Sequence, residues 1–498
     1  MDRAFFALAH QCKVNSPTDT IALMKLTTLF LLAFTATTFA APQWNQWRGP
    51  NRNGLDPNSP PLISKLPDDG LKPVWSSETI PSGRDGGWSS PVVANGKLYV
   101  YVHARELKPG AKLPKRKFPW LAPDKRGHLS AAEYRQYEID RRNEDEMFSK
   151  FYGFYETLWC IDAANGKTVW KNRRESVYTR FVQSPTPTVV NGKAYVQGAG
   201  RKARCIDANT GKDLWETRMP GEFRDQFMMS SFAVTDGVAA VLAGHLFAFD
   251  ANTGSILWQG HPRSTRGTHT SPTVWNNTFI VNVGDRETAC FEPKSGKEKW
   301  RIKSWAGLST PVVTDNLMIT FGSSRRGGVR CFELSDSNEP KHRWTVDDIA
   351  DKGSSPVVVN DHVFVQGDTT LGCIDIASGK LTWQTKLGIN GPQYTSLVAA
   401  DGKILYTYGM FLWFEANPKK YTPLAQAKLS QSGIIASKNS HWRRLKLDQE
   451  SDPKKAQKLY NADVGKVTPL QCASPAFDRG RVFLRLRKSI ACYDLNVR

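Results

Sequence analysis

Cationic, amide and aromatic side chains stand a few residues before a Ser-Pro or similar dipeptide that recurs along the chain. Such a mixture at the mouth of a cavity suits an anionic or sugar-like ligand. We therefore predict a binding site from these residues, with an ordinary solvated rim as the alternative. The candidates are Arg84, Trp88, Arg180, Gln183, Arg224, Gln226, Arg266, His269, Trp305, Lys352, Tyr394 and Gln471.

Motifs for covalent or metal chemistry are missing from the sequence. There is no Ser-His-Asp set, no phosphate-binding Walker loop and no His-Glu-x-x-His motif. Residues 124–133 resemble the later half of a calcium-binding EF-hand loop, but Ala122 and Arg126 stand where acidic ligands belong. We therefore predict no catalytic residues and no metal site, and expect a binding protein rather than an enzyme.

A repeated phrase indicates the elements that must position the candidate residues. It reads Cys-Ile-Asp or a close variant, passes through a turn that contains Gly, and closes on Trp. A phrase that returns at a period near forty residues in short β-rich units is typical of a β-propeller. The clearest copies span residues 160–170, 205–215, 249–258, 290–300 and 373–383.

Each unit can be divided into four strands, and the units can be counted from their openings. The openings lie at residues 90, 184, 231, 271, 309, 354, 396 and 474, with Ser184-Pro185 taken for the second. The last unit ends after Asp494 without a Trp strand, and residues 72–75 supply a spare one. We predict an all-β fold, an eight-bladed propeller of four-stranded antiparallel blades closed by the segment around Trp75, with seven or nine blades as the alternatives.

Six cysteines share one register in the third strand of the units. Equivalent positions in different blades lie too far apart for a disulfide, so we predict small buried side chains. A redox or metal site built from them is the alternative. These residues are Cys160, Cys205, Cys290, Cys331, Cys373 and Cys492.

Two long insertions fall in links that meet on one side of a propeller, which we call the loop face. Residues 103–157 lie inside the first blade and residues 430–466 lie between the seventh and eighth. The first insertion should contain a helix over residues 131–150. Both insertions are basic in parts and the formal net charge is +20, which indicates an anionic partner or solubility alone.

The N-terminal region predicts export. Residues 1–40 are expected to form a signal peptide, with Met24 as an alternative start and small residues before the cleavage position. An N-terminal extension should cover residues 41–71 and the propeller residues 72–498. We expect a periplasmic or extracellular monomer without a transmembrane segment, which binds a protein or an anionic cell-surface ligand and no nucleic acid.

The repeated phrase resembles the pyrroloquinoline-quinone (PQQ) dehydrogenase repeat, Ala-x-Asp-x-x-Thr-Gly-x-x-x-Trp, over residues 75–494. Residues 44–54 look like the opening of exported PQQ-like propellers of the planctomycete type. The resemblance implies a PQQ-like propeller, similar in fold to BamB, the propeller subunit of the outer-membrane β-barrel assembly machinery.

Two functions remain open under this resemblance. Dehydrogenases of the family hold PQQ with a calcium ion bound by Glu, Asn and Asp, and they place adjacent cysteines beside the quinone. This sequence has no adjacent Cys pair, so we expect a non-catalytic scaffold without a cofactor that binds through its basic loop face. The alternative is a PQQ-dependent quinoprotein dehydrogenase that oxidises an alcohol or a sugar and carries PQQ with calcium.

Overall fold

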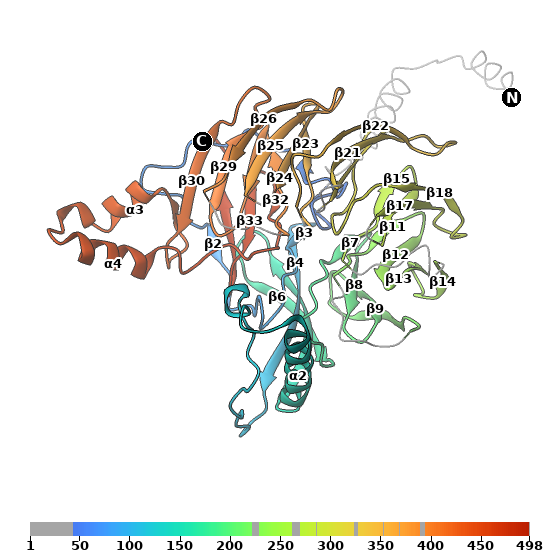
Figure 1. Cartoon of the computed structure of the whole chain (residues 1–498), viewed down its shortest axis with the longest axis horizontal. Coiled ribbons are helices and arrows are strands. Elements are labelled where there is room, and N and C mark those ends of the chain that lie inside the picture. The colour runs from blue at the N-terminus through green and yellow to red at the C-terminus, as the bar shows by residue number, and fades with distance from the viewer. Residues whose placement is uncertain are drawn as a thin grey trace, which may run out of the picture. The chain divides into compact units, whose positions relative to one another are not determined.

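The computed structural model contains eight sheets, one for each unit of the repeat (Figure 1). The prediction of an eight-bladed propeller with four-stranded antiparallel blades is therefore confirmed. The predicted signal peptide lies outside the residues that the structure describes, and so do Arg224, Gln226, Arg266 and Lys352. The described ranges are 43–221, 229–260, 269–284, 286–322, 327–351, 353–367, 369–388 and 394–497.

Six blades contain four consecutive strands each, and two blades take strands from elsewhere in the chain. Blade 1 contains β3 (Val92–Ala94), β4 (Lys97–Leu107), β5 (Tyr152–Asp162) and β6 (Thr168–Glu175). Blade 2 contains β7 (Thr188–Val190), β8 (Lys193–Gly198), β9 (Lys202–Asp207) and β10 (Asp213–Arg218). Blade 3 contains β11 (Ala233–Thr235), β12 (Val238–Ala243), β13 (His245–Asp250) and β14 (Ile256–Gln259). Blade 4 contains β15 (Thr273–Trp275), β16 (Thr278–Val283), β17 (Glu287–Phe291) and β18 (Glu298–Lys303). Blade 5 contains β19 (Val312–Thr314), β20 (Leu317–Gly322), β21 (Gly328–Glu333) and β22 (Lys341–Val346). Blade 6 contains β23 (Val357–Val359), β24 (His362–Gly367), β25 (Thr370–Asp375) and β26 (Leu381–Lys386). Blade 7 contains β27 (Val398–Ala400), β28 (Lys403–Tyr406), β29 (Phe411–Glu415) and β30 (Pro423–Leu429), extended by β1 (Leu55–Asp56) and β31 (Ile435–Ala436), and blade 8 contains β32 (Ala476–Asp478), β33 (Arg481–Arg485), β34 (Ile490–Asp494) and β2 (Trp75–Ser76).

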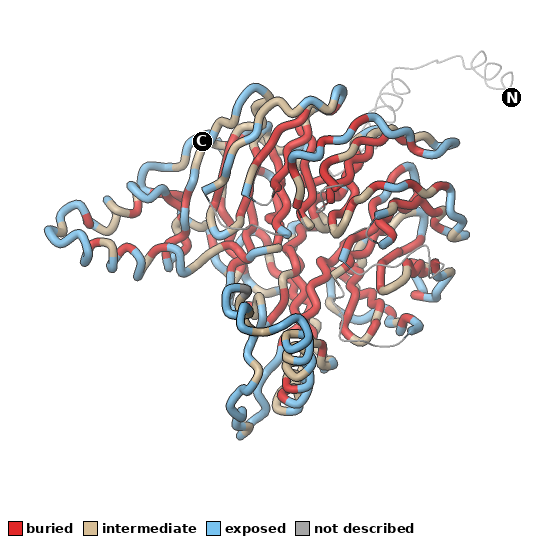
Figure 2. The backbone as a smooth tube through the Cα atoms, viewed as in Figure 1, coloured by how far each residue is buried: buried red, intermediate tan, exposed pale blue. Residues whose placement is uncertain are grey.

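The core lies between adjacent blades (Figure 2). Inner strands such as β8 and β24 are buried along most of their length, because a neighbouring blade covers each of their faces. The outer strand β6 alternates between half-buried and exposed residues, as expected for a strand with one covered face. Apolar side chains from two neighbouring blades therefore fill each layer of the core.

The repeated phrase joins each blade to the next. Trp170 of blade 1 packs on Gly211 of blade 2, where φ is +75° and a Cβ would lie 2.7 Å from the indole ring. The Asp207 carboxylate holds this turn by accepting the backbone N–H of Thr210 at 2.7 Å. Trp215 repeats the contact one blade further on, where its Nε1 donates to a carbonyl of blade 3 at 3.2 Å. The repeated tryptophans therefore anchor neighbouring blades to one another.

The N-terminal strand β2 completes the last blade. Trp75 lies opposite Cys492 in an antiparallel pair, and the backbone N–H of Ile490 donates to Ser77 Oγ at 3.0 Å. Trp75 Nε1 also donates to the Ala163 carbonyl of blade 1 at 3.1 Å. The predicted closure is confirmed, and it removes the open edge that blade 8 would otherwise present.

A ring of side-chain hydroxyls, which we call the hydroxyl ring, joins the first residues of the blades. At seven of the eight junctions the backbone N–H of one opening residue donates to the hydroxyl of the next at 2.9–3.2 Å. At the junction of blades 7 and 8 the Cys472 N–H donates to Thr395 Oγ1 instead. In order, the ring contains Ser474, Ser90, Thr186, Ser231, Ser271, Thr310, Ser355 and Ser396.

The second blade opens at Thr186, so the expected opening at Ser184-Pro185 is wrong by two residues. β7 begins two residues after Thr186, as β3 does after Ser90. Ser184 instead accepts the backbone N–H of Trp88 at 2.9 Å. Both positions combine a hydroxyl residue with Pro, so the local sequence could not separate them.

Residues 43–56, which we call the channel segment, run along the innermost strands. The backbone N–H of Val93 donates to the Trp44 carbonyl, and that of Val189 donates to the Asn45 carbonyl, each at 2.8 Å. β1 pairs in parallel with β27 of blade 7. An innermost strand has one edge without a partner in its own blade, and the channel segment satisfies part of that edge.

Two arginines of the channel segment are buried without a carboxylate among the described residues. Arg48 Nη2 donates to the Leu397 carbonyl at 3.1 Å, and Arg52 Nη1 donates to the Pro272 carbonyl at 2.8 Å. Burial lowers the pKa of each guanidinium to about 9, so both stay charged at neutral pH. These cations therefore tie the channel segment to blades on different sides of the ring.

Gly54→Ala should destabilise the protein by about 2–4 kcal/mol. Gly54 has a φ of +81°, and a Cβ would lie 2.5 Å from Arg48 Nη2, which would displace the buried guanidinium. Gly96→Ala is the matched control, since φ is +69° and no atom lies within 4 Å of the added Cβ. Urea unfolding should show a larger loss of unfolding free energy for Gly54→Ala than for Gly96→Ala. Equal losses would mean that backbone strain alone accounts for the effect.

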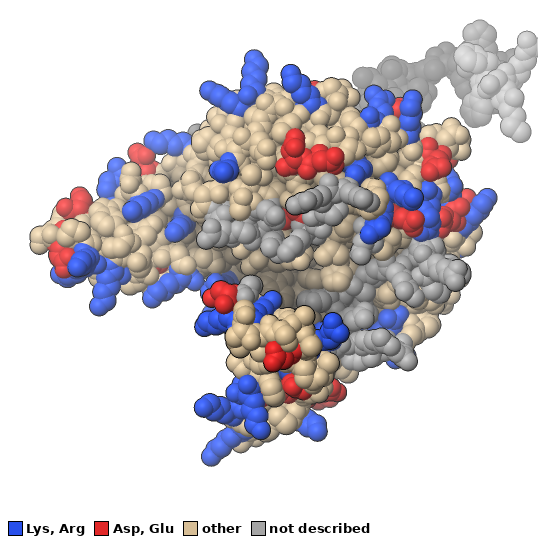
Figure 3. Space-filling view, viewed as in Figure 1, with Lys and Arg blue, Asp and Glu red and all other residues tan. Residues whose placement is uncertain are grey.

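The two insertions project away from the blades in different directions (Figure 1), and both carry Lys and Arg together with acidic residues (Figure 3). The first contains the expected helix as α2 (Ala131–Ser149), preceded by η1 (Pro123–Lys125). The second is also helical, which the sequence analysis did not predict. It contains α3 (Lys438–Arg444), η2 (Leu447–Gln449) and α4 (Pro453–Asp463). None of the described helices is long and apolar enough to cross a membrane.

The six cysteines of the repeated register form no disulfide within the described residues 43–497, and all six are buried. Burial raises the pKa of Cys160 and of Cys290 to about 11. Their thiols are therefore protonated at neutral pH and behave as small core side chains, as the sequence predicts.

Candidate functional site

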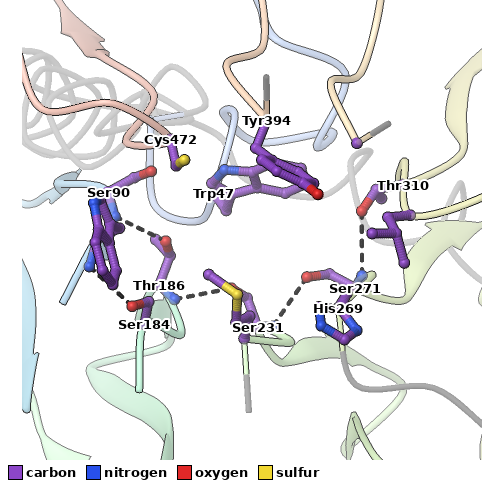
Figure 4. A pocket seen from close by; sticks show the side chains of 14 residues that line it. Trp47, Ser90, Ser184, Thr186, Ser231, His269, Ser271, Thr310, Tyr394 and Cys472 are labelled. Carbon is purple, nitrogen blue, oxygen red and sulfur yellow. Dashed lines mark hydrogen bonds between the residues drawn. The ribbon is translucent and has the colours of Figure 1, made fainter. Parts of the chain in front are cut away.

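A cavity of about 300 Å³ opens on the channel axis above the channel segment; we call it the axial cavity (Figure 4). The hydroxyl ring supplies much of its wall, because the residues that open the blades converge there. Three aromatic side chains complete it: Trp47 of the channel segment, Trp88 and Tyr394. The other described residues of the wall are Ser90, Ser184, Thr186, Met229, Ser231, His269, Ser271, Leu308, Thr310, Gly353 and Cys472.

The described wall of the axial cavity combines hydroxyl groups with aromatic and other apolar side chains. Hydroxyl oxygens of the wall accept backbone N–H groups, as Ser231 Oγ does from Thr186 at 3.0 Å, and a hydroxyl that only accepts has a hydrogen left to donate; Ser184 Oγ already donates to the Val182 carbonyl at 3.3 Å. Among the described wall residues there is no carboxylate, lysine or arginine. This wall suits a ligand with hydroxyl or carbonyl groups and a flat face.

One buried carboxylate lies beside the axial cavity, and the sequence analysis missed it. Asp351 is 1 % exposed, and its Oδ2 accepts the backbone N–H groups of Gly353 and Ser354 at 3.1 and 2.6 Å. Burial, and secondarily the Asp351 charge, raises the pKa of the Cys472 thiol to about 12. The Cys472 thiol in the cavity wall is therefore protonated at neutral pH.

The residues around the axial cavity do not fit a calcium–quinone centre. Calcium takes six to eight oxygen ligands, carboxylates among them, and Asp351 is a single carboxylate with Oδ2 already engaged. The described part of the chain contains no group of three His, Cys, Asp or Glu side chains that could hold a metal. Cys472 also stands alone, whereas the dehydrogenases place two adjacent cysteines beside the quinone.

The twelve predicted site residues do not form one ring. Trp88, His269 and Tyr394 line the axial cavity. Arg84 and Arg180 lie with Trp88 around a second cavity. The remaining described candidates lie elsewhere: Gln183 is fully buried and donates its amide to the Phe181 carbonyl, Trp305 packs 5.0 Å from the Arg286 guanidinium, and Gln471 is exposed.

The second cavity, of about 790 Å³, lies between the first insertion and the adjoining blade; we call it the insertion cavity. Five arginines and seven aromatic residues line it, against one carboxylate. The arginines are Arg84, Arg105, Arg116, Arg141 and Arg180, the aromatic residues are Trp88, Trp120, Phe148, Tyr152, Phe154, Tyr178 and Phe181, and the carboxylate is Asp145.

The first insertion has a defined structure, held by a helix cap and by hydrogen bonds to α2. Ser130 caps α2 in a reciprocal capping box with Glu133. Further along α2, the buried Glu144 carboxylate accepts the backbone N–H groups of Lys117 and Phe118 at 2.7 and 3.0 Å. These bonds fix the strand-to-helix loop against α2 and so preform one wall of the insertion cavity.

Carboxylates hold three of the five arginines. Arg116 pairs with Asp145 at 2.6 Å, Arg141 pairs with Glu138 at 2.7 Å, and Arg180 lies 3.6 Å from Glu138. Of these, sequence reasoning selected only Arg180 as a site residue. Arg105 and Arg141 come from a strand and a helix whose side chains meet only in the fold, and no local motif marks them.

The comparisons with known proteins agree with the fold. Residues 155–385 match a family model described as outer membrane protein assembly factor BamB. Among solved structures, BamB from Moraxella catarrhalis is 13 % identical, with a TM-score of 0.47 over 69 % of this chain and 91 % of the other.

Two dehydrogenases are also similar in fold. A europium-containing methanol dehydrogenase is 12 % identical, with a TM-score of 0.52 over 92 % of this chain and 99 % of the other. The quinohemoprotein alcohol dehydrogenase of Comamonas testosteroni is 12 % identical, with a TM-score of 0.54 over 94 % and 82 %. At these identities the likeness concerns the fold alone. No curated protein sequence matches the chain.

Proposed function

Since this chain is a PQQ-like repeat propeller whose residues 155–385 match the BamB family, we propose that it is a non-catalytic binding protein that captures an anionic partner on its loop face. The observation that carries the proposal is the contrast between the two cavities. Among the described residues, the wall of the axial cavity carries no carboxylate, lysine or arginine, and no group of three side chains could hold a metal. The insertion cavity, on the same face, concentrates five arginines.

The proposed setting is outside the cytoplasm, with the protein acting as a monomer. The signal-like pattern of residues 24–40 supports export. A formal net charge of +20 would draw anionic proteins or cell-surface polymers toward the loop face, and salt would weaken this attraction over a screening length of about 8–10 Å.

Reconstitution tests this function against the dehydrogenase. After incubation with PQQ and calcium followed by gel filtration, we expect neither a stoichiometric quinone absorbance nor dye-linked oxidation of alcohols or sugars. The physical reason is that the described residues beside the axial cavity include no set of carboxylates that could hold calcium. An apo quinohemoprotein alcohol dehydrogenase treated in parallel serves as the positive control. Stoichiometric PQQ with substrate oxidation would overturn the binding role and restore the enzyme.

A further inference from the structure

The insertion cavity has the charge of an anion site. Its described wall carries five arginines and one aspartate. Arg84 and Arg105 are exposed and form no ion pair within the described residues, whereas Arg116 and Arg141 are held by carboxylates of α2. The paired arginines stiffen the wall, and the two unpaired guanidiniums leave positive charge for an occupant.

Aromatic rings set the directions of these cations. The Arg105 guanidinium lies 4.9 Å from the Tyr152 ring centroid, and the Arg116 guanidinium lies 4.8 Å from that of Phe148. Arg116 already donates to Asp145 at 2.6 Å, whereas Arg105 has no carboxylate partner among the described residues, and its N–H edge matches a carboxylate or a sulfate with two parallel hydrogen bonds. The site therefore favours planar or tetrahedral oxyanions.

Large aromatic surfaces stay uncovered beside this charge. Trp120 of the first insertion is 56 % exposed, and it lines the cavity together with Trp88 and Tyr178. An occupant must therefore present an apolar face as well as negative groups. A pyranose ring that carries an acidic group does both, since its C–H face packs on the electron-rich face of an aromatic ring.

We propose that the insertion cavity binds an acidic oligosaccharide whose pyranose rings carry carboxylate or sulfate groups. This rests on the binding role proposed above and names its ligand. Trp88 lines both cavities, so a chain seated in the insertion cavity can reach the axial cavity. There, the hydroxyl ring offers donors to sugar hydroxyls.

The test is calorimetric titration of the full-length protein with three oligosaccharides of equal length: a polyuronate, a sulfated galactan and a neutral galactan. Binding is expected for the uronate, the sulfated sugar or both, and not for the neutral one. The double variant Arg84→Gln/Arg105→Gln should lose about tenfold affinity or more for each arginine. Because both side chains are exposed, its thermal melting should match that of the unaltered protein.

The matched control is Arg135→Gln/Arg142→Gln. Both residues lie exposed on α2 outside the cavity wall, so this variant loses the same charge from the same insertion. It should retain the affinity. Absence of binding to both acidic sugars, equal losses in the two double variants, or equal binding of the neutral sugar would overturn the proposal. If one of these three results is obtained and the protein also takes up no PQQ, the acidic-sugar proposal fails while the general binding role stands. If the protein takes up PQQ and oxidises substrate, both proposals fail.

Discussion

A protein that begins at residue 81 should fail to accumulate in folded form, or should melt far below the full chain. The deletion removes β2, which closes blade 8, and the channel segment with its two buried arginines. It also removes apolar side chains that each contribute about 1.5–3 kcal/mol when buried, against a net stability of about 5–15 kcal/mol. The buried residues are Trp44, Leu62, Leu71, Trp75 and Ile80.

A second truncation separates the two contributions. A protein that begins at residue 57 loses the channel segment and keeps β2, so it should fold with a melting temperature between those of the other two. Thermal melting followed by circular dichroism compares the three proteins. If the protein that begins at residue 81 melts like the full chain, β2 does not close the ring.

Arg485→Met should cost about 3–5 kcal/mol of unfolding free energy. Arg485 is 2 % exposed and makes five hydrogen bonds that join blade 8 to the entry of blade 1. Burial lowers its pKa to about 9, so it is charged at neutral pH, and Met would leave the acceptors buried without a donor. The acceptors are Ser82 Oγ and the carbonyls of Pro81, Gly86, Ser89 and Tyr101.

Arg487→Met is the control for this change, because Arg487 is exposed two residues further along the chain. Urea unfolding of both variants measures the difference. If Arg485→Met lowers the unfolding free energy by less than about 1 kcal/mol, the effect is no larger than that of an ordinary surface substitution. Solvent would then satisfy the acceptors that Arg485 leaves.

The blade count and the closure could be predicted because their contacts leave a signature inside each unit. The Asp207 turn, Gly211 and the tryptophan of the preceding blade form one contact, so the same residue types must recur in every unit. The last unit lacks its Trp-containing strand after Asp494, and an extra strand of this kind occurs at Trp75. Together they indicate how the ring closes.

The channel segment and the insertion cavity could not be predicted in the same way. Arg48 and Arg52 donate to main-chain carbonyls, which any sequence supplies, so their partners have no recognisable side chains. Arg105 and Arg141 approach one cavity from β4 and from α2, and only the packing of the first insertion brings them together. Among the predicted candidates, Gln183 is buried and donates its amide to the Phe181 carbonyl, a contact that the sequence does not reveal.

The closure by β2 also bears on how the protein reaches its native state. The hydrogen bond between Ile490 and Ser77 joins residues 413 positions apart, so blade 8 remains incomplete until both ends of the chain are present. Contacts of such long range form slowly, and until β2 pairs, the edge of β34 presents free backbone N–H and C=O groups. Strand exchange with another chain is therefore expected to become more frequent as the concentration of incompletely folded molecules rises.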